Sequence, residues 1–275
     1  MIKVTYSDWM GYKVLNEELK VNHFPDNTLL LTTENIDFYR PIDINWHYEN
    51  DAELFTIICL AKKAKSNKSL YMSYCPHARM DRCKTEDDTF TLKYFAEVIN
   101  SLKFDNVLVI DPHSSVCEAL IDNIIVESPI EYIRNIISEN FLDEISLNKF
   151  SLFFPDEGAC KRYSGMFSNP HTFGVKRRDW KTGRIEGLDV IGDKDLIKDK
   201  TILIVDDICS RGGTFYHSAK KLKELGAKKV YLYVTHCENT ILEGELLTSG
   251  LIEKVFTTNS IFTKEHEKIE VYNLD

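Results

Sequence analysis

The sequence predicts an α/β protein built from two tandem domains, each a mainly parallel sheet flanked by helices. First, short runs rich in Val, Ile and Leu alternate with helix-like stretches of about 10–15 residues, a pattern typical of parallel sheets. Second, the 275 residues of the chain exceed the ~100–200 residues of an average domain. Third, the alternation restarts near residue 130. We therefore predict domains at residues 1–130 and 131–275.

The expected strands are short apolar or β-branched runs bounded by polar residues or turn-forming residues. In chain order they are Thr28–Thr33, Ser69–Tyr74, Asn106–Ile110, Ser151–Phe154, Thr201–Val205, Lys229–Val234, Lys254–Thr257 and Ile269–Tyr272. The expected helices lie between these strands. They are Asp51–Ala64, Thr91–Leu102, Ser114–Leu120, Pro129–Asn140, Gly158–Met166, Gly213–Leu225 and Thr240–Thr248. In open α/β sheets, ligands bind beyond the carboxyl ends of strands, so motifs at those positions are the strongest site candidates.

Composition narrows the classes of function. Hydrophobic residues make up 43% of the chain, charged residues 28%, and the formal net charge is −9. An acidic balance argues against nucleic acid or an anionic membrane as a partner. No apolar run reaches the ~18 residues of a membrane span, and the start of the sequence lacks a signal-peptide apolar region. The seven cysteines are scattered without a C-x-x-C pair, which favours reduced thiols and a cytoplasmic location.

The stretch Ile202–Phe215, with the sequence ILIVDDICSRGGTF, carries the strongest motif. A buried strand is expected to end at Asp206 and Asp207, and two glycines precede the next helix. Glycine permits positive φ and close backbone approach, and a helix N-terminus there would bind an anion. Carboxylates beside an anion site suit a ligand with both hydroxyls and phosphate. The alternative is a strand, a turn and a helix start with capping acids.

This stretch resembles the loop V-D-D-x-x-D-T-G-G-T, which type I phosphoribosyltransferases share with PRPP synthetases (ribose-phosphate pyrophosphokinases). The resemblance implies that the carboxylates contact ribose hydroxyls and that the following loop contacts the 5-phosphate. The residues that it assigns to ribose-phosphate binding are Asp206, Asp207, Ser210, Arg211, Gly212, Gly213 and Thr214. Ser210 and Arg211 stand where the family loop has aspartate and threonine, so one acid is lost and one cation gained.

Two stretches of the first domain resemble PRPP synthetase rather than the transferases. Cys75–Arg82 resembles Y-A-R-x-D-R, a loop that contacts ATP in the family, which assigns ATP binding to Arg79, Asp81 and Arg82. A fork-shaped guanidinium suits a polyphosphate. Val109–Ser114 resembles V-D-L-H-A, which implies that His113 lies by the metal and the ATP phosphates and takes part in catalysis. Taken alone, the first stretch would equally suit a surface loop with two salt-bridging arginines, and the second would favour a structural histidine.

Two stretches of the second domain continue the resemblance. Phe153–Ala159 resembles S-P-D-x-G-G, which implies that Asp156 helps His113 to hold Mg²⁺. Gly174–Asp179 resembles D-K-R-R and implies a catalytic role for Lys176 and Arg178. The polar segment Asp179–Gly187, which contains two glycines, is expected to form a mobile loop. Without the resemblance, the first is a turn with a helix cap and the second a solvated basic loop.

Near the N-terminus, Phe24-Pro-Asp26 resembles the start of F-x-D-G-E. In the family this segment touches the adenine of a neighbouring subunit, so the resemblance assigns Phe24 and Asp26 to ATP binding as well.

The resemblance implies a fold of two phosphoribosyltransferase-like domains and a reaction that uses ATP and Mg²⁺. The β,γ-diphosphate of ATP would pass to the C1 hydroxyl of ribose 5-phosphate, giving PRPP and AMP. An alternative acceptor is ADP-ribose, giving ADP-ribose pyrophosphate for NAD⁺ synthesis, because Arg211 suits a larger anion. A further alternative is a non-catalytic regulatory homologue. The expected partners are small-molecule substrates and further copies of the chain, in at least a dimer.

Overall fold

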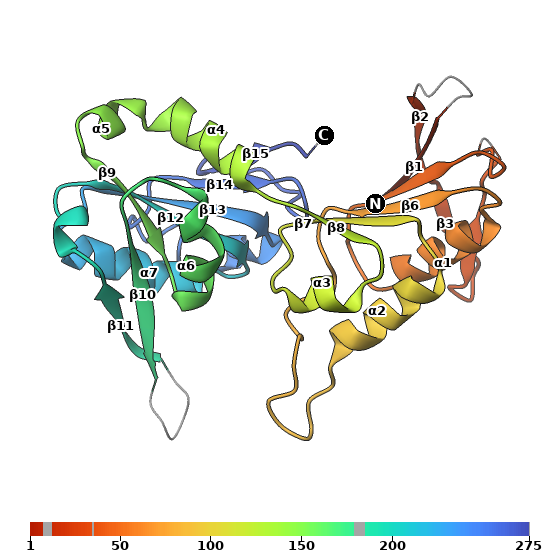
Figure 1. Ribbon diagram of the computed structural model, residues 1–275, viewed down its shortest axis with the longest axis horizontal. Coiled ribbons are helices and arrows are strands. Elements are labelled where there is room, and N and C mark those ends of the chain that lie inside the picture. The colour runs from red at the N-terminus through yellow and green to blue at the C-terminus, as the bar shows by residue number, and fades with distance from the viewer. Residues whose placement is uncertain (8–12, 35, 179–184, 275) are drawn as a thin grey trace. The chain divides into compact units, whose positions relative to one another are not determined.

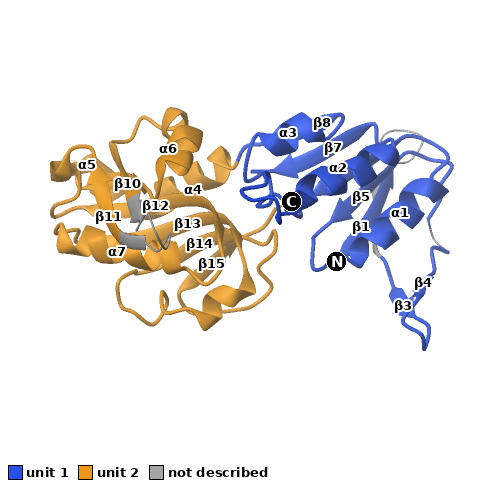
Figure 2. Ribbon diagram, turned by 90° about the horizontal axis from the view of Figure 1, so that it is seen from below, with its two compact units in different colours: residues 1–128 blue, residues 129–275 orange. Residues whose placement is uncertain are grey.

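The computed structural model describes residues 1–275 except 8–12, 35, 179–184 and 275. The chain divides into two compact units, Met1–Ser128 and Pro129–Asp275 (Figure 2). The predicted boundary at residues 130 and 131 lies close to this division, at the start of the helix Ile130–Asn140.

The first unit is built on a six-stranded sheet of order β2-β1-β5-β6-β7-β8. Its strands are β1 (Ile2–Ser7), β2 (Lys13–Glu18), β5 (Ile42–Trp46), β6 (Lys68–Met72), β7 (Asn106–Ile110) and β8 (Ile124–Glu127). The strands from β5 to β8 pair in parallel, whereas β1 pairs antiparallel with both β2 and β5. A separate hairpin joins β3 (Val21–His23) to β4 (Leu29–Leu31).

Helices cover one face of this sheet. They are α1 (Glu53–Lys63), α2 (Thr91–Ser101) and α3 (Val116–Leu120), which lie on the same side of the strands in both ribbon views (Figures 1 and 2). Along β5, the residues Ile42, Ile44 and Trp46 are buried while Asp43 and Asn45 are partly exposed. This alternation is expected of a sheet with one face packed on the core.

The second unit has a seven-stranded sheet of order β11-β10-β9-β12-β13-β14-β15. Its strands are β9 (Phe150–Phe154), β10 (His171–Arg178), β11 (Ile185–Ile191), β12 (Thr201–Cys209), β13 (Lys229–Cys237), β14 (Val255–Thr258) and β15 (Ile269–Tyr272). Only the pair of β10 with β11 is antiparallel.

Helices pack on both faces of the second sheet. Its helices are α4 (Ile130–Asn140), α5 (Leu142–Ser146), α6 (Glu157–Tyr163) and α7 (Gly213–Glu224). Ile202 and Ile204 of β12 join the core beneath α7, while Leu203 and Val205 join the core beneath α4 and α6. Since successive strand residues point to opposite faces, β12 is buried on both sides.

The predicted fold class is confirmed, but several elements differ. The antiparallel strands β1, β2 and β11 were not predicted, nor were β5, β8 and β10. The run Thr28–Thr33 contains only the short strand β4. The predicted helix Thr240–Thr248 is wrong, because the chain there forms a 3₁₀-helix, η3 (Asn239–Glu243), followed by turns.

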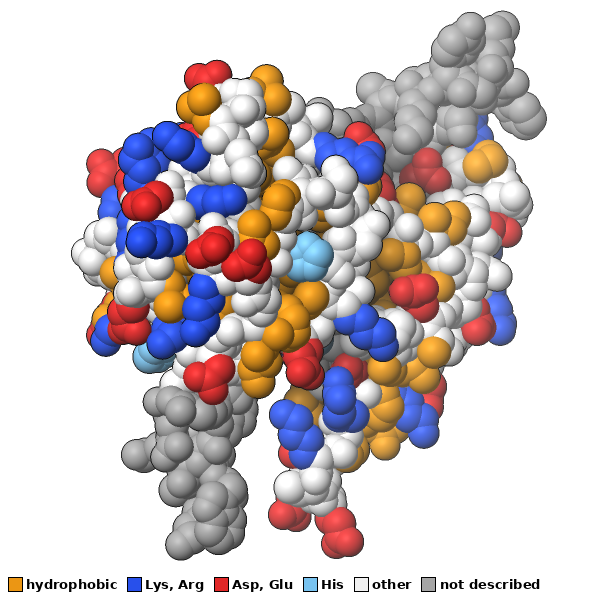
Figure 3. Space-filling model, turned by 60° about the vertical axis from the view of Figure 1, so that its left-hand side comes forward, with side chains coloured by type: hydrophobic (Ala, Val, Ile, Leu, Met, Phe, Trp, Pro, Cys, Tyr) orange, Lys and Arg blue, Asp and Glu red, His pale blue; other side chains and the backbone are white. Residues whose placement is uncertain are grey.

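The surface carries many charged side chains (Figure 3), as expected from a chain in which 28% of the residues are charged. On the face drawn in Figure 3, acidic and basic side chains are interspersed. In the described part of the chain, none of the helices combines the length and the apolar character needed to cross a membrane.

The close packing of β10 on the end of β9 gives the first prediction. A Cβ at Gly174 would lie 2.8 Å from the carbonyl oxygen of Pro155 and 2.9 Å from the side chain of Leu188. We expect Gly174→Ala to cost about 1–3 kcal/mol, because overpacking forces neighbours to shift. Urea unfolding measures the loss. The matched control is Gly165→Ala, where a Cβ meets nothing within 4 Å and the change should stay within about 0.5 kcal/mol. Equal stability of the two variants would contradict the prediction.

Candidate active site

Three carboxylates lie at the ends of two neighbouring parallel strands in the second unit. We predicted a strand Thr201–Val205 with Asp206 and Asp207 at its carboxyl end. In the structure β12 continues to Cys209, so both acids lie within the strand, near its end. Asp207 is buried and Asp206 half-buried, and one oxygen of Asp206 accepts a hydrogen bond from the backbone N–H of Asp207 at 2.9 Å. Asp156 follows the adjacent strand β9 and caps α6, because its Oδ1 accepts from the N–H of Ala159 at 3.0 Å.

The electrostatics of this strand end are unfavourable to negative charge. Burial raises the pKa of Asp206 well above its usual range, and the negative charges of Asp207 and Asp156 raise it further. A carboxyl group perturbed by burial and by named charged neighbours is a functional-site candidate. The structure therefore places Asp207 and Asp156 near Asp206, while the roles of the three acids in binding ribose and metal stay predictions.

Arg162, on α6, balances part of this charge. Its Nη1 lies 3.2 Å from Oδ2 of Asp207, and the Arg162 side chain is only 24% exposed. The sequence interpretation missed Arg162, although it lies one helix length after the capping Asp156 and thus on the element that reaches the strand end. The charge of Arg162 partly neutralises Asp207. Of the two acids, Asp206 is therefore the one whose ionised form is more costly.

An open helix N-terminus adjoins the acids. Gly212 is the N-cap of α7 with φ +77°, in the left-handed region that favours glycine, and it offers no side chain to cap the first turn. A Cβ on Gly212 would lie 3.0 Å from Leu246. By contrast, a Cβ on Gly213 would meet nothing within 4 Å. The fold therefore needs the first glycine, whereas the second leaves space beside N–H groups of the kind that bind anions at helix N-termini.

The remaining loop residues are more exposed. Ser210 and Thr214 are partly exposed, and Arg211 is exposed. The Nη2 of Arg211 lies 3.0 Å from Oε2 of Glu243, a residue that the sequence interpretation did not select.

The first unit holds a second polar cluster, at the carboxyl ends of β6 and β7. Arg82 donates two hydrogen bonds to the buried carboxylate of Asp81, from Nε at 2.8 Å and Nη2 at 3.2 Å. Burial raises the pKa of Asp81, but the hydrogen bonds and the positive charge of Arg82, together with the neighbouring Ser114 and His113, outweigh it, so the pKa is lowered. Asp81 thus lies close to His113 and holds Arg82 of its own loop. Arg79 is exposed on the same loop.

Phe24 and Asp26 lie in the turn between β3 and β4. Phe24 is exposed, and Asp26 accepts from the hydroxyl and the backbone N–H of Thr28 at 2.7 and 3.0 Å. These bonds lower the pKa of Asp26. The carboxylate thus stabilises its own turn, and contact with adenine stays a prediction for both residues.

The backbones of Lys176 and Arg178 lie on β10, paired with Leu188 and Ile185 of β11. Their side chains and residues 179–184 of the predicted mobile loop lie outside the described residues. Their catalytic role stays a prediction.

The donor set partly fits the expected Mg²⁺. Carboxylate oxygens are the ligands that Mg²⁺ prefers, and it commonly takes one or two of them together with substrate phosphates. Among the described residues, no three His, Cys, Asp or Glu side chains are arranged to hold a metal alone. Asp156, with Asp206 beside it, would therefore supply only part of a coordination shell. His113, the other predicted ligand, belongs to the first unit.

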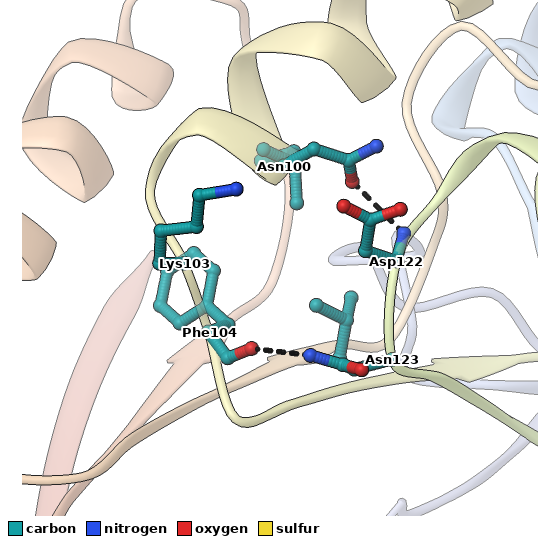
Figure 4. Close-up of a pocket in the computed structure, with 7 residues that line it drawn as sticks. Asn100, Lys103, Phe104, Asp122 and Asn123 are labelled. Carbon is teal, nitrogen blue, oxygen red and sulfur yellow. Dashed lines mark hydrogen bonds between the residues drawn. The ribbon is translucent and has the colours of Figure 1, made fainter.

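The first unit also has a cavity of about 250 Å³, and none of the residues that line it is a predicted site residue (Figure 4). It adjoins the amino ends of β7 and β8, where Asn100 accepts from the N–H of Asp122 at 2.9 Å and Asn123 donates to the carbonyl of Phe104 at 3.0 Å. The loop with Arg79, Asp81 and Arg82 follows the carboxyl end of β6, and His113 follows that of β7, so these residues lie at the opposite ends of the strands.

The crowding at Asp206 gives the second prediction. Its pKa is raised in the folded state, whereas an unfolded aspartate titrates near about 3.9. The folded state thus binds a proton that the unfolded state releases, and stability falls as pH rises from about 4 towards the raised pKa. We expect Asp206→Asn to stabilise the protein at pH 8 in EDTA by about 0.5–2 kcal/mol, a gain that disappears near pH 4. Thermal unfolding across pH measures this. A gain that is the same at every pH would contradict the electrostatic cause.

Comparisons with known proteins agree with the motifs. Residues 181–274 match the family model described as the phosphoribosyl synthetase-associated domain. A ribose-phosphate pyrophosphokinase of Gloeobacter violaceus is 28% identical over 214 residues, which cover 76% of this chain and 62% of that protein. One of Nostoc sp. is 28% identical over 221 residues, covering 78% of this chain and 64% of that protein. The matches thus span less than two thirds of these relatives.

Among solved structures, the phosphoribosylpyrophosphate synthetase of Mycobacterium smegmatis superposes with a TM-score of 0.74 at 19% identity. The match covers 93% of this chain and 86% of that one, and it shows a common fold. The chain is thus similar in sequence to ribose-phosphate pyrophosphokinases and similar in fold to a phosphoribosylpyrophosphate synthetase.

Proposed function

We propose that this chain, whose relatives are ribose-phosphate pyrophosphokinases, is an ATP- and Mg²⁺-dependent diphosphotransferase that acts on ribose 5-phosphate. The observation that carries the proposal is the junction of β12 and α7. There, the carboxylates of Asp206 and Asp207 are followed within one loop by an uncapped helix N-terminus. A sugar phosphate needs both features, because its hydroxyls donate to carboxylates and its phosphate accepts from N–H groups.

On the acceptor side, Asp206 and Asp207 take the ribose 2- and 3-hydroxyls. Hydroxyl donors relieve the cost of holding Asp206 charged, since a carboxylate that accepts hydrogen bonds is stabilised in that form. The loop Ser210–Thr214 takes the 5-phosphate, with the open side of Gly213 facing it.

On the ATP side, Arg79 and Arg82 bind the phosphates. Both guanidinium groups are exposed, while the buried Asp81 holds Arg82 in place. His113, which lies by Asp81, orients the phosphates. Phe24 and Asp26 contribute to adenine binding in an assembly of at least two copies, whose mass in solution tests that part of the proposal.

In the transfer step, the C1 oxygen of the sugar forms a bond to the β-phosphorus of ATP. The bond from that phosphorus to the oxygen of the α-phosphate breaks, AMP leaves, and the hydroxyl proton passes to solvent. Lys176 and Arg178 neutralise charge on the moving group, a role that rests on positioning and electrostatics. Asp156, together with the substrate phosphates, would hold Mg²⁺, and this ion would supply further charge neutralisation.

ADP-ribose is the second candidate acceptor. Arg211 is 73% exposed and its guanidinium is paired outward with Glu243, which is compatible with a phosphate that continues into a larger group. The chemistry at C1 is the same for both acceptors. This candidate would assign the chain to NAD⁺ synthesis.

The test is AMP release from ATP and Mg²⁺ with ribose 5-phosphate and ADP-ribose in parallel. The expected result is AMP with ribose 5-phosphate, abolished by EDTA. AMP with ADP-ribose alone would make the second candidate correct. AMP with neither would exclude both and favour a non-catalytic regulatory homologue.

A glycine substitution separates ligand binding from folding. We expect Gly213→Ala to leave the protein as stable or up to about 1 kcal/mol more stable, because alanine favours helices and the site has space for its methyl group. The same methyl group would occupy the approach to the N–H groups and raise the KM for the acceptor at least about tenfold, since a lost charged hydrogen bond costs ~1.5–3 kcal/mol. Steady-state kinetics and thermal unfolding check both parts. An unchanged KM would show that the anion does not approach this glycine.

A further inference from the structure

We propose that Glu243 weakens acceptor binding, because it holds Arg211 in an ion pair that the acceptor phosphate must displace. The inference rests on the proposed function and extends it to a residue outside every motif of the sequence. In effect, Glu243 competes with the ligand for one guanidinium and weakens the binding of anions at the loop.

The first step of the argument is that the backbone at Arg211 is fixed. The segment 238–246 packs directly on the loop, and we call it the brace segment. The N–H of Glu238 donates to the carbonyl of Cys209 at 2.8 Å. A Cβ on Gly244 would lie 1.9 Å from the carbonyl oxygen of Arg211, and one on Gly212 would lie 3.0 Å from Leu246. Only glycine permits this approach, so Arg211 can change partner through its side chain alone.

The second step is that the ion pair is exchangeable. The side chains of Arg211 and Glu243 are 73% and 59% exposed, and a single pair of atoms, Nη2 and Oε2, makes the contact at 3.0 Å. An exposed pair of this kind is weak and screened by salt. In the proposed complex, a phosphate binds at the N-terminus of α7, which follows Arg211 closely in the chain. The phosphate carries up to two negative charges, and the hydrogen bonds that it accepts from a guanidinium are stronger than hydrogen bonds between neutral groups.

The third step is the direction of the effect. Breaking the pair costs part of the ligand's binding free energy, and that cost falls on every acceptor whose phosphate needs Arg211. Without Glu243, the guanidinium is free before the ligand arrives, so the acceptor binds more tightly. A brace that merely supported the loop would have the opposite effect, since its loss would weaken binding.

The test is Glu243→Gln, with Glu245→Gln as the matched control. Glu245 lies in the brace segment, is exposed, and its side chain has no hydrogen bond or ion pair among the described residues. We expect Glu243→Gln to lower the KM for ribose 5-phosphate about two- to fivefold, the range that corresponds to an exposed ion pair of up to ~1 kcal/mol. The kcat and the KM for ATP should stay unchanged, and the effect should shrink at 0.5 M salt. Glu245→Gln should change none of these values.

A double-mutant cycle makes the result specific to Arg211. In an Arg211→Ala background, Glu243→Gln should no longer lower the KM. A KM that falls equally in both backgrounds would mean that Glu243 repels the ligand directly, and a KM that stays or rises in the single variant would mean that it supports the loop. Either result overturns the proposal.

Binding of inorganic phosphate, measured by calorimetry, distinguishes this proposal from the proposed function. If no AMP forms but Glu243→Gln binds phosphate more tightly than the wild type, the ion pair controls an anion site of another activity. If neither protein binds phosphate, the proposal is wrong.

Discussion

The structure depends on one electrostatic constraint, the concentration of negative charge at the end of a buried strand. β12 lies in the middle of its sheet, with residues of both faces in the core, and its last part carries Asp206 and Asp207. Asp156 comes from the neighbouring strand end, and Arg162 pairs with Asp207. A fold selected only for stability would not place two adjacent acids there, because burial of like charges is costly. The arrangement makes sense when the hydroxyls and the cation of a ligand complete it.

Local sequence accounts for the parts of the site that are continuous along the chain. In Ile202–Phe215, the strand, the acids, the glycines and the helix follow one another, so the order of these elements could be predicted from neighbouring residues. The same holds for Asp156, whose capping role is a property of the turn between β9 and α6. The fold class was predictable because the alternation of buried strands and helices extends through both units.

Contacts between distant residues explain what the sequence did not reveal. Arg162 contacts Asp207 across 45 positions of the chain and Arg211 contacts Glu243 across 32, and no local pattern marks either pair.

The helix predicted at Thr240–Thr248 is wrong for a related reason. Gly244 has to pack against the carbonyl of Arg211, so tertiary packing at the loop overrides the local preference. The first strands were missed because β1 and β2 pair antiparallel at the edge of the sheet, outside the strand–helix alternation.

The two clusters contain three arginine–carboxylate pairs that differ in burial. The more a pair is buried, the less readily its arginine can leave the carboxylate and bind another anion. Arg162 and Asp207 are 24% and 4% exposed, so neither group can leave without an uncompensated charge, and the pair is structural. In the pair of Arg82 with Asp81 the acid is 4% exposed but the arginine 71% exposed. The acid is thus an anchor, while the outer side of the guanidinium can bind a second anion. In the pair of Arg211 with Glu243 both partners are exposed, and nothing but a weak ion pair keeps them together. Burial thus makes Arg162 a fixed cation, Arg82 an anchored cation and Arg211 an exchangeable cation, and the proposed displacement by an acceptor phosphate requires a cation of the last kind.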